Sequence, residues 1–226
     1  TMGNSVFAYC FSLEKISIPS TLTSIPVYTF QNCSKLVSVD LPDTIETIDI
    51  GAFGSCTSLS SIKLPSSLKK LCGNAFGGCT SLREVTFTGN SLTTIEDNVF
   101  HSCKSLKELT LPNGLESIGS SVFYDCDSLE KVTFPSSLTY YGFTLFEGCH
   151  NISTVKLPRG LTSITKEFGN SSIKDVYIPK EITSISIQKF INSGVCNVHF
   201  EAESKPTECW LTDEYNNFFF GETLDY

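Results

Sequence analysis

One pattern, F-x-x-C-x-x-L-x-x-I-x-L-P-x-x-L-x-x-I, recurs along most of the 226-residue chain and constrains the fold more than any other feature. The first seven phenylalanines are 23 residues apart, except for one step of 24, and a cysteine follows each of them by three residues. The pairs are Phe7/Cys10, Phe30/Cys33, Phe53/Cys56, Phe76/Cys79, Phe100/Cys103, Phe123/Cys126 and Phe146/Cys149. Two degenerate units without this cysteine follow at Phe168 and Phe190, so the sequence predicts a repeat protein.

Each unit contains a short segment in which apolar and polar residues alternate, which predicts a strand with one buried face. In most units a proline ends this strand, because its ring fixes φ and it has no N–H to donate. The unit leaves no room for the helices of a doubly wound sheet or a TIM barrel. One unit cannot bury its own apolar residues, but stacked units can. We therefore expect an α/β-type repeat solenoid, made mostly of β-structure, with about nine 23-residue coils, parallel strands on its concave face and few or no regular helices.

The segments "GAFGSCTSLSSIKLP" (51–65) and "NAFGGCTSLREVTF" (74–87) give the pattern in its clearest form. In them the chain resembles the treponemal, BspA-like class of leucine-rich repeats, and the resemblance covers about residues 5–200. It implies a surface protein of a bacterium or a protozoan parasite that adheres to host matrix, host cells or other microbes. The family motif contains no catalytic residues, so it implies neither an enzyme nor a cofactor.

The repeats predict one solenoid domain over residues 4–200, followed by a segment over residues 201–226 that is rich in aromatic and acidic residues. This last segment is interpreted as a cap over the open end of the core, and the alternative is a tail that docks a partner. The N-terminus has no comparable segment, so the expectation is either that further repeats or a cap precede the first coil in the natural protein or that the first coil is partly exposed. In the second case, the first coil is a candidate surface for end-to-end self-association.

Two coils depart from the pattern. The fourth replaces proline with "FTGNSL" (87–92) and adds one residue, and because Gly89 and Asn90 tolerate positive φ, a different turn is expected there. The eighth coil is two residues shorter than the others, which predicts a tighter coil near the C-terminal end.

The ten cysteines raise the question of disulfides or zinc. Seven of them share one repeat position, so we expect a buried structural ladder in which each thiol acts as a small apolar residue: Cys10, Cys33, Cys56, Cys79, Cys103, Cys126 and Cys149. No short pair of zinc-ligand spacing occurs. Cys196 and Cys209 are candidates for a disulfide that joins the last repeat to the closing segment, and two free thiols are the alternative. Cys72 has no evident partner.

The outward residues of the predicted strands form two columns, which together are nearly neutral and rich in serine and threonine. One column runs Lys15, Ser38, Ser61, Glu84, Glu108, Lys131, Thr154, Asp175, Asn197, and the other runs Ser17, Asp40, Lys63, Thr86, Thr110, Thr133, Lys156, Tyr177, His199. Because binding hot spots favour tyrosine, the end around Tyr177 is the best candidate for partner contacts. The candidate set is Thr110, Thr133, Lys156, Tyr177 and His199, and exposed Tyr140 on the return segment is a second candidate.

The formal net charge of −8 disfavours nucleic acid as a partner, and no apolar run is long enough to insert into a membrane. His101, His150 and His199 fall at different repeat positions, so we expect neither a metal site nor a catalytic triad. The sequence thus predicts a non-catalytic module that binds a protein or a glycan. The family resemblance favours a cell-surface or secreted adhesion protein, and the alternative is an intracellular protein–protein interaction scaffold.

Overall fold

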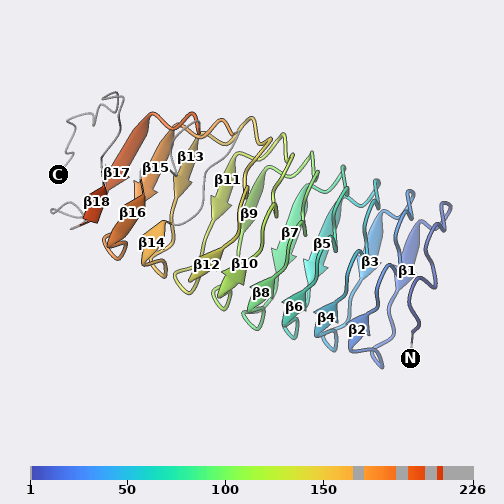
Figure 1. The fold of residues 1–226 in the computed structure, drawn as a ribbon. Helices are drawn as coiled ribbons and strands as arrows, with labels where there is room; N and C mark the ends of the chain where they lie inside the picture. Colours follow the sequence, from blue (N-terminus) through green and yellow to red (C-terminus); the bar gives the residue numbers. More distant parts are fainter. Residues whose placement is uncertain (1, 165–170, 187–192, 202–207, 211–226) are drawn as a thin grey trace.

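The computed structural model describes residues 2–164, 171–186, 193–201 and 208–210, and their strands form two parallel rows that run along a solenoid (Figure 1). The long-strand row contains β1 (Lys15–Ser17), β3 (Ser38–Asp40), β5 (Ser61–Leu64), β7 (Glu84–Phe87), β9 (Glu108–Thr110), β11 (Lys131–Thr133), β13 (Thr154–Lys156), β15 (Asp175–Ile178) and β17 (Asn197–Phe200). The short-strand row contains β2 (Ser24–Ile25), β4 (Thr47–Ile48), β6 (Lys70–Leu71), β8 (Thr94–Ile95), β10 (Ser117–Ile118), β12 (Tyr140–Tyr141), β14 (Ser163–Ile164), β16 (Ser184–Ser186) and β18 (Glu208–Trp210).

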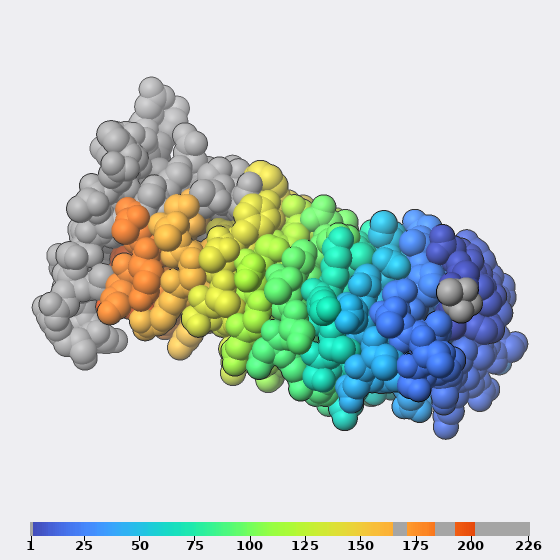
Figure 2. Space-filling view, turned by 90° about the horizontal axis from the view of Figure 1, so that it is seen from below, coloured from blue at the N-terminus to red at the C-terminus, as the bar shows by residue number. Residues whose placement is uncertain are grey.

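This architecture confirms the predicted repeat solenoid, and the residues that the structure describes contain no helix. Its coils follow one another along an elongated body, from the blue N-terminal end to the orange end (Figure 2). About seven complete turns lie within the described residues, slightly fewer than the nine coils expected, because the turns around Phe168 and Phe190 lie outside them. The predicted cap also falls outside the described residues, apart from Glu201 and β18.

All strand pairs are parallel, and each residue pairs with the residue at the same repeat position in the next coil. Val155 on β13, for example, pairs with Val176 on β15, which in turn pairs with Val198 on β17. A shift of one residue would turn each inward side chain to solvent, so the repeated apolar pattern fixes this register.

The interior is built from ladders of identical side chains. The phenylalanine rings of the first seven coils stack in sequence, with centroids 5.2 to 6.2 Å apart and planes within 13° of parallel. Leucine, isoleucine and valine from both rows fill the rest of one continuous core. Each coil thus buries its apolar face against the next, as the physics of stacked repeats requires.

Two residues in each of the first seven coils adopt left-handed backbone conformations, two positions before and two after the phenylalanine. They are Ser5, Tyr9, Tyr28, Asn32, Gly51, Ser55, Asn74, Gly78, Asn98, Ser102, Ser121, Asp125, Thr144 and Gly148. These tight turns let backbone N–H groups reach the carbonyls of the next coil, as when the Ser102 amide donates to Tyr124 O over 2.7 Å. Glycine and asparagine recur in this set because they adopt positive φ at little cost.

The turn of the fourth coil forms without positive φ. Neither Gly89 nor Asn90 has positive φ, and the Thr88 amide instead continues the strand contact by donating to Leu64 O over 3.0 Å. Gly89 is needed for another reason, since a Cβ there would lie 2.6 Å from the Cα of Ser66 in the preceding coil.

Candidate functional site

The long-strand row presents two outward columns of side chains, and the register places members of each column side by side. Thr110 on β9 pairs with Thr133 on β11, and both side chains are exposed. Further along, Tyr177 on β15 pairs with Lys156 on β13 on one side and with His199 on β17 on the other.

Three of the five candidate residues form one line of contacts. The rings of Tyr177 and His199 are stacked, with centroids 4.3 Å apart and planes at 12°. The ammonium of Lys156 lies over the Tyr177 ring, 5.2 Å from its centroid, which is within the range of a cation–π interaction. Thr110 and Thr133 take no part in this line, so the structure brings together Lys156, Tyr177 and His199 only.

Asp175, in the neighbouring column, holds His199 in place. Its Oδ1 lies 2.9 Å from His199 Nε2 and also accepts a hydrogen bond of 2.9 Å from Asn197 Nδ2. The hydrogen bond with His199, followed by that from Asn197, lowers the pKa of the Asp175 carboxyl below its ordinary value. Asp175 and Asn197 both belong to the outward columns predicted from the sequence. Only the side-chain geometry shows that they support the site formed by Lys156, Tyr177 and His199, which we call the Tyr177 site.

The seven ladder cysteines lie at equivalent places along the core, and six of them are buried while Cys10 is partly exposed. From Cys33 onward, each thiol contacts the carbonyl oxygen of the phenylalanine in the preceding coil, at 2.9 to 3.4 Å. Burial raises the pKa of Cys79 and of Cys149 to about 12. From Cys33 to Cys149 the ladder is therefore a row of protonated, weakly donating thiols at neutral pH.

The remaining cysteines differ from the ladder. Cys72 is buried beside the Asp49 carboxylate, 3.7 Å away, and burial raises its pKa to about 11. Cys196 is exposed just before β17, whereas Cys209 lies in β18 of the other row. The side chain of Cys209 lies outside the described part of the chain, so the disulfide between Cys196 and Cys209 stays a prediction.

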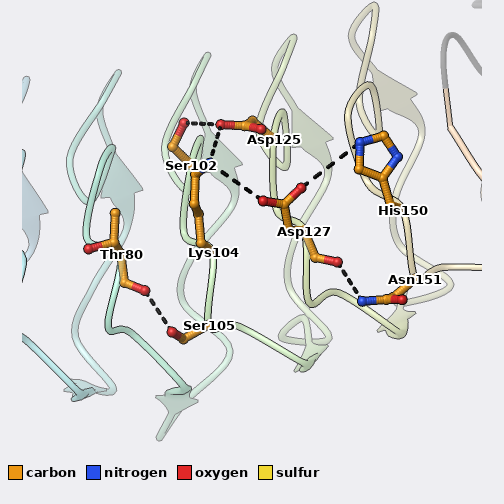
Figure 3. Close-up of polar contacts among 8 residues, drawn as sticks. All are labelled: Thr80, Ser102, Lys104, Ser105, Asp125, Asp127, His150 and Asn151. Atoms are coloured by element: carbon orange, nitrogen blue, oxygen red, sulfur yellow. Dashed lines mark hydrogen bonds and ion pairs between the residues drawn. The ribbon is translucent and has the colours of Figure 1, made fainter.

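A second group of polar side chains lies along the loop edge, which we define as the turns between each phenylalanine and the following long strand (Figure 3). The Lys104 ammonium lies 3.4 Å from the carboxylates of both Asp125 and Asp127. The Ser102 hydroxyl donates to Asp125 over 3.0 Å, and His150 Nε2 lies 4.0 Å from Asp127. Such exposed pairs contribute little stability, but they set the charge of this edge.

The three histidines lie in different surroundings. His199 contacts Asp175, His150 contacts Asp127, and His101 packs over Gly77, where burial lowers the pKa of its imidazole. Within the described residues, no group of three or more histidine, cysteine or carboxylate side chains is arranged to hold a metal ion. In the same part of the chain, no helix is long and apolar enough to cross a membrane.

A repeated coil with stacked phenylalanines, a cysteine ladder and parallel strand rows defines a class of leucine-rich repeat. The family model for the BspA type leucine-rich repeat region matches residues 1–91 and 88–197, so the chain belongs to this family. Members are repeat proteins that generally bind other proteins. No curated protein shows significant similarity to the chain.

Solved structures of bacterial leucine-rich repeat proteins share the fold. One from Bacteroides ovatus is 27% identical, with a TM-score of 0.62 over 88% of this chain and 58% of that protein. The Treponema pallidum leucine-rich repeat protein is 25% identical, with a TM-score of 0.54 over 82% of this chain and 72% of that protein. A leucine-rich cell surface protein from Faecalibacterium prausnitzii is 24% identical, with a TM-score of 0.51 over 88% of this chain and 62% of that protein. The chain thus spans less than two thirds of the first and third of these proteins.

Proposed function

We propose that the chain is the non-catalytic binding module of a cell-surface or secreted adhesion protein. Its membership of a family that generally binds proteins supports the binding role, and the family resemblance supports the surface location. The partner would be a protein on host matrix, a host cell or another microbe.

One observation carries the proposed contact site: the line of contacts that joins Lys156, Tyr177 and His199 on the long-strand face. Most of this face is serine, threonine and scattered charge, but here a tyrosine is held in one orientation by its neighbours. Preorganised aromatic side chains are frequent binding hot spots because little entropy is lost when they bind.

The same geometry favours a protein ligand over a glycan. Sugar rings bind aromatic residues through the ring face, but Lys156 lies over Tyr177 and His199 is stacked against it from the opposite neighbouring strand. The edge and the hydroxyl of the tyrosine are left for the partner. They suit the backbone and polar side chains of a protein.

The alternative is an intracellular scaffold. The unpaired ladder thiols support it, because free thiols persist mainly in reducing compartments. The ladder weakens that argument, because thiols that are buried and have raised pKa values resist oxidation in any compartment. An intact-mass measurement decides between the surface protein and the intracellular scaffold. The protein is taken from its native source and alkylated under denaturing conditions without reductant. Ten alkylated thiols without glycan would favour the scaffold, and eight, or added glycan mass, would favour export.

The site is tested by binding of the purified chain to panels of immobilised matrix proteins and glycans. Tyr177→Ala combined with His199→Ala should weaken capture of a protein ligand by about tenfold or more, as is typical of a hot spot. Lys63→Ala, on the same column near the other end, is the matched control and should bind normally. Unchanged capture by the double variant would remove this site, and capture of glycans alone would overturn the choice of a protein ligand.

Self-association through the N-terminal coil also stays a proposal. Three apolar side chains of that coil are more than half exposed, namely Val6 at 52%, Tyr9 at 57% and Phe11 at 57%. They mark the surface that such a contact would bury.

A further inference from the structure

A pocket of about 530 Å³ opens on the loop edge, away from the Tyr177 site. Tyr124, Glu147 and His150 line it from the sixth and seventh coils, and Ser171 and Ser193 line it from the two coils that follow. Its volume falls within the range of known ligand sites, which is about 300–1,000 Å³.

The pocket lies where the repeat changes length. From the second to the seventh coil a cysteine is followed three residues later by a buried leucine or isoleucine, whereas Ser171 and Ser193 are followed by Ile173 and Val195 after only two residues. In both shortened turns, the amide of that apolar residue points to the serine hydroxyl, at 3.5 Å for Ile173 and 3.3 Å for Val195. The pocket thus lies where these turns of the loop edge become shorter after the seventh coil.

The pocket combines an aromatic ring with an uncompensated carboxylate. Tyr124 and Glu147 occupy the same repeat position in adjacent coils, and the Tyr124 side chain is 42% exposed. The nearby acids Asp125 and Asp127 share the Lys104 ammonium. Glu147 is half-buried, and among the described residues none forms an ion pair with its carboxylate. A half-buried carboxylate without a partner favours a cationic ligand.

We propose that this pocket receives an arginine side chain of a protein partner, which gives the module a second contact site besides the long-strand face. A guanidinium is planar, so it can stack on the Tyr124 ring while its N–H groups bond the Glu147 carboxylate in pairs. A lysine ammonium is a compact point charge and does not combine the two interactions in this way. Among the described residues that line the pocket, none is a lysine or an arginine that would repel the ligand.

The proposal is tested by NMR titration of the ¹⁵N-labelled chain with N-acetyl-arginine-N-methylamide, and with the matching citrulline compound as a neutral probe of equal shape. We expect saturable shifts of the Tyr124, Glu147 and Gly148 amides with arginine and at least about tenfold weaker binding of citrulline, which corresponds to roughly 1.4 kcal/mol.

Two variants and two controls sharpen the test. Glu147→Gln should weaken arginine binding about tenfold, and Tyr124→Leu should weaken it about threefold. Glu130→Gln removes a carboxylate of the same edge that is already paired with Lys107, 3.7 Å away, and should leave binding unchanged. Tyr177→Ala should also have no effect, which separates this site from the proposed function.

Absence of saturable shifts up to the solubility limit of the probe would overturn the proposal. Equal binding of arginine and citrulline would do the same, because it would show that charge plays no part. Unchanged binding by Glu147→Gln would exclude the carboxylate as the recognition group, provided that the amide spectrum of the variant shows the native fold.

Discussion

Cysteine meets two requirements at its ladder position: it is small and apolar enough for the core, and it can donate a weak hydrogen bond. The site is fully buried at Cys79, which favours a small apolar residue, yet the thiol also gives the Phe53 carbonyl oxygen, 3.1 Å away, a second donor beside the Cys56 amide. Alanine or valine would leave that oxygen with the Cys56 amide, 3.2 Å away, as its remaining donor, and the loss of a buried hydrogen bond costs stability. A thiol is apolar enough for the core and still donates a weak hydrogen bond.

The replacement Cys79→Ala should therefore lower the free energy of unfolding by about 1–3 kcal/mol, because it removes one of the two donors to Phe53 O and leaves a small cavity. Urea denaturation measures the change. Cys196→Ala is the matched control, since that thiol is exposed, and it should change stability by less than about 0.5 kcal/mol. Equal losses in both variants would contradict a role for the buried thiol.

The sequence predicted where the ladder thiols lie but not what they contact. The spacing places Cys79 above Cys56, because both occur at the same point of the repeat. The acceptor, however, is a backbone carbonyl of the preceding coil. Side-chain patterns carry no information about such backbone groups, so this contact could only be seen in the structure.

At the scale of one turn, the fourth coil shows how an inserted residue is accommodated. The sequence suggested a special turn at Gly89 and Asn90, because those residues tolerate positive φ. The structure instead moves the added length toward the next coil, where Asn90 lies against Gly114 and its side-chain carbonyl accepts a hydrogen bond of 3.0 Å from the Asn113 amide. Local propensity could not reveal this contact, because its partner lies one full coil away.

Gly114→Ala should consequently destabilise the fold by about 1–3 kcal/mol, since its Cβ would overlap the backbone carbonyl of Asn90, which cannot move aside freely. Thermal and urea unfolding both report the loss. Gly73→Ala is the control, because a Cβ there meets its nearest atom, Asp97 O, at 3.4 Å. If the two variants proved equally stable, the proposed crowding between the fourth and fifth coils would be wrong.

The candidate binding site was predictable only in part, also at the scale of the strand. The two outward columns followed from the alternation within each strand, and they placed Tyr177 between Lys156 and His199. The line of contacts itself depends on rotamers, and the anchoring of His199 by Asp175 crosses from one column to the other. The loop-edge pocket was missed because it arises from two missing residues, not from a motif.

For the whole molecule, the ladder links stability to pH. Each coil adds one thiol to the same desolvated column, and burial raises the pKa values of the thiols from Cys33 to Cys149 above the ordinary value. The unfolded chain exposes these groups, and they then ionise with a pKa of about 8.5. Because stability in a solenoid is approximately a sum over coils, these contributions should add.

The sign of the effect follows from proton binding. Between the unfolded pKa near 8.5 and the folded value of about 12 for Cys79 and Cys149, the folded state holds protons that the unfolded state has lost. The ladder's contribution is therefore fully present below about pH 8.5 and is lost as the pH rises through this window, by up to about 1.4 kcal/mol per pH unit for each thiol.

Urea midpoints measured from pH 8 to pH 11 should fall steeply above about pH 9. Tyrosines also ionise there, so the comparison that isolates the ladder is between the native chain and Cys149→Ala, which keeps every tyrosine. The variant should begin less stable at pH 8, and its stability should fall less steeply, by up to about 1.4 kcal/mol per pH unit. Parallel curves for the two proteins would show that Cys149 ionises alike in the folded and unfolded chains. The claim that burial keeps the ladder thiols protonated would then be wrong.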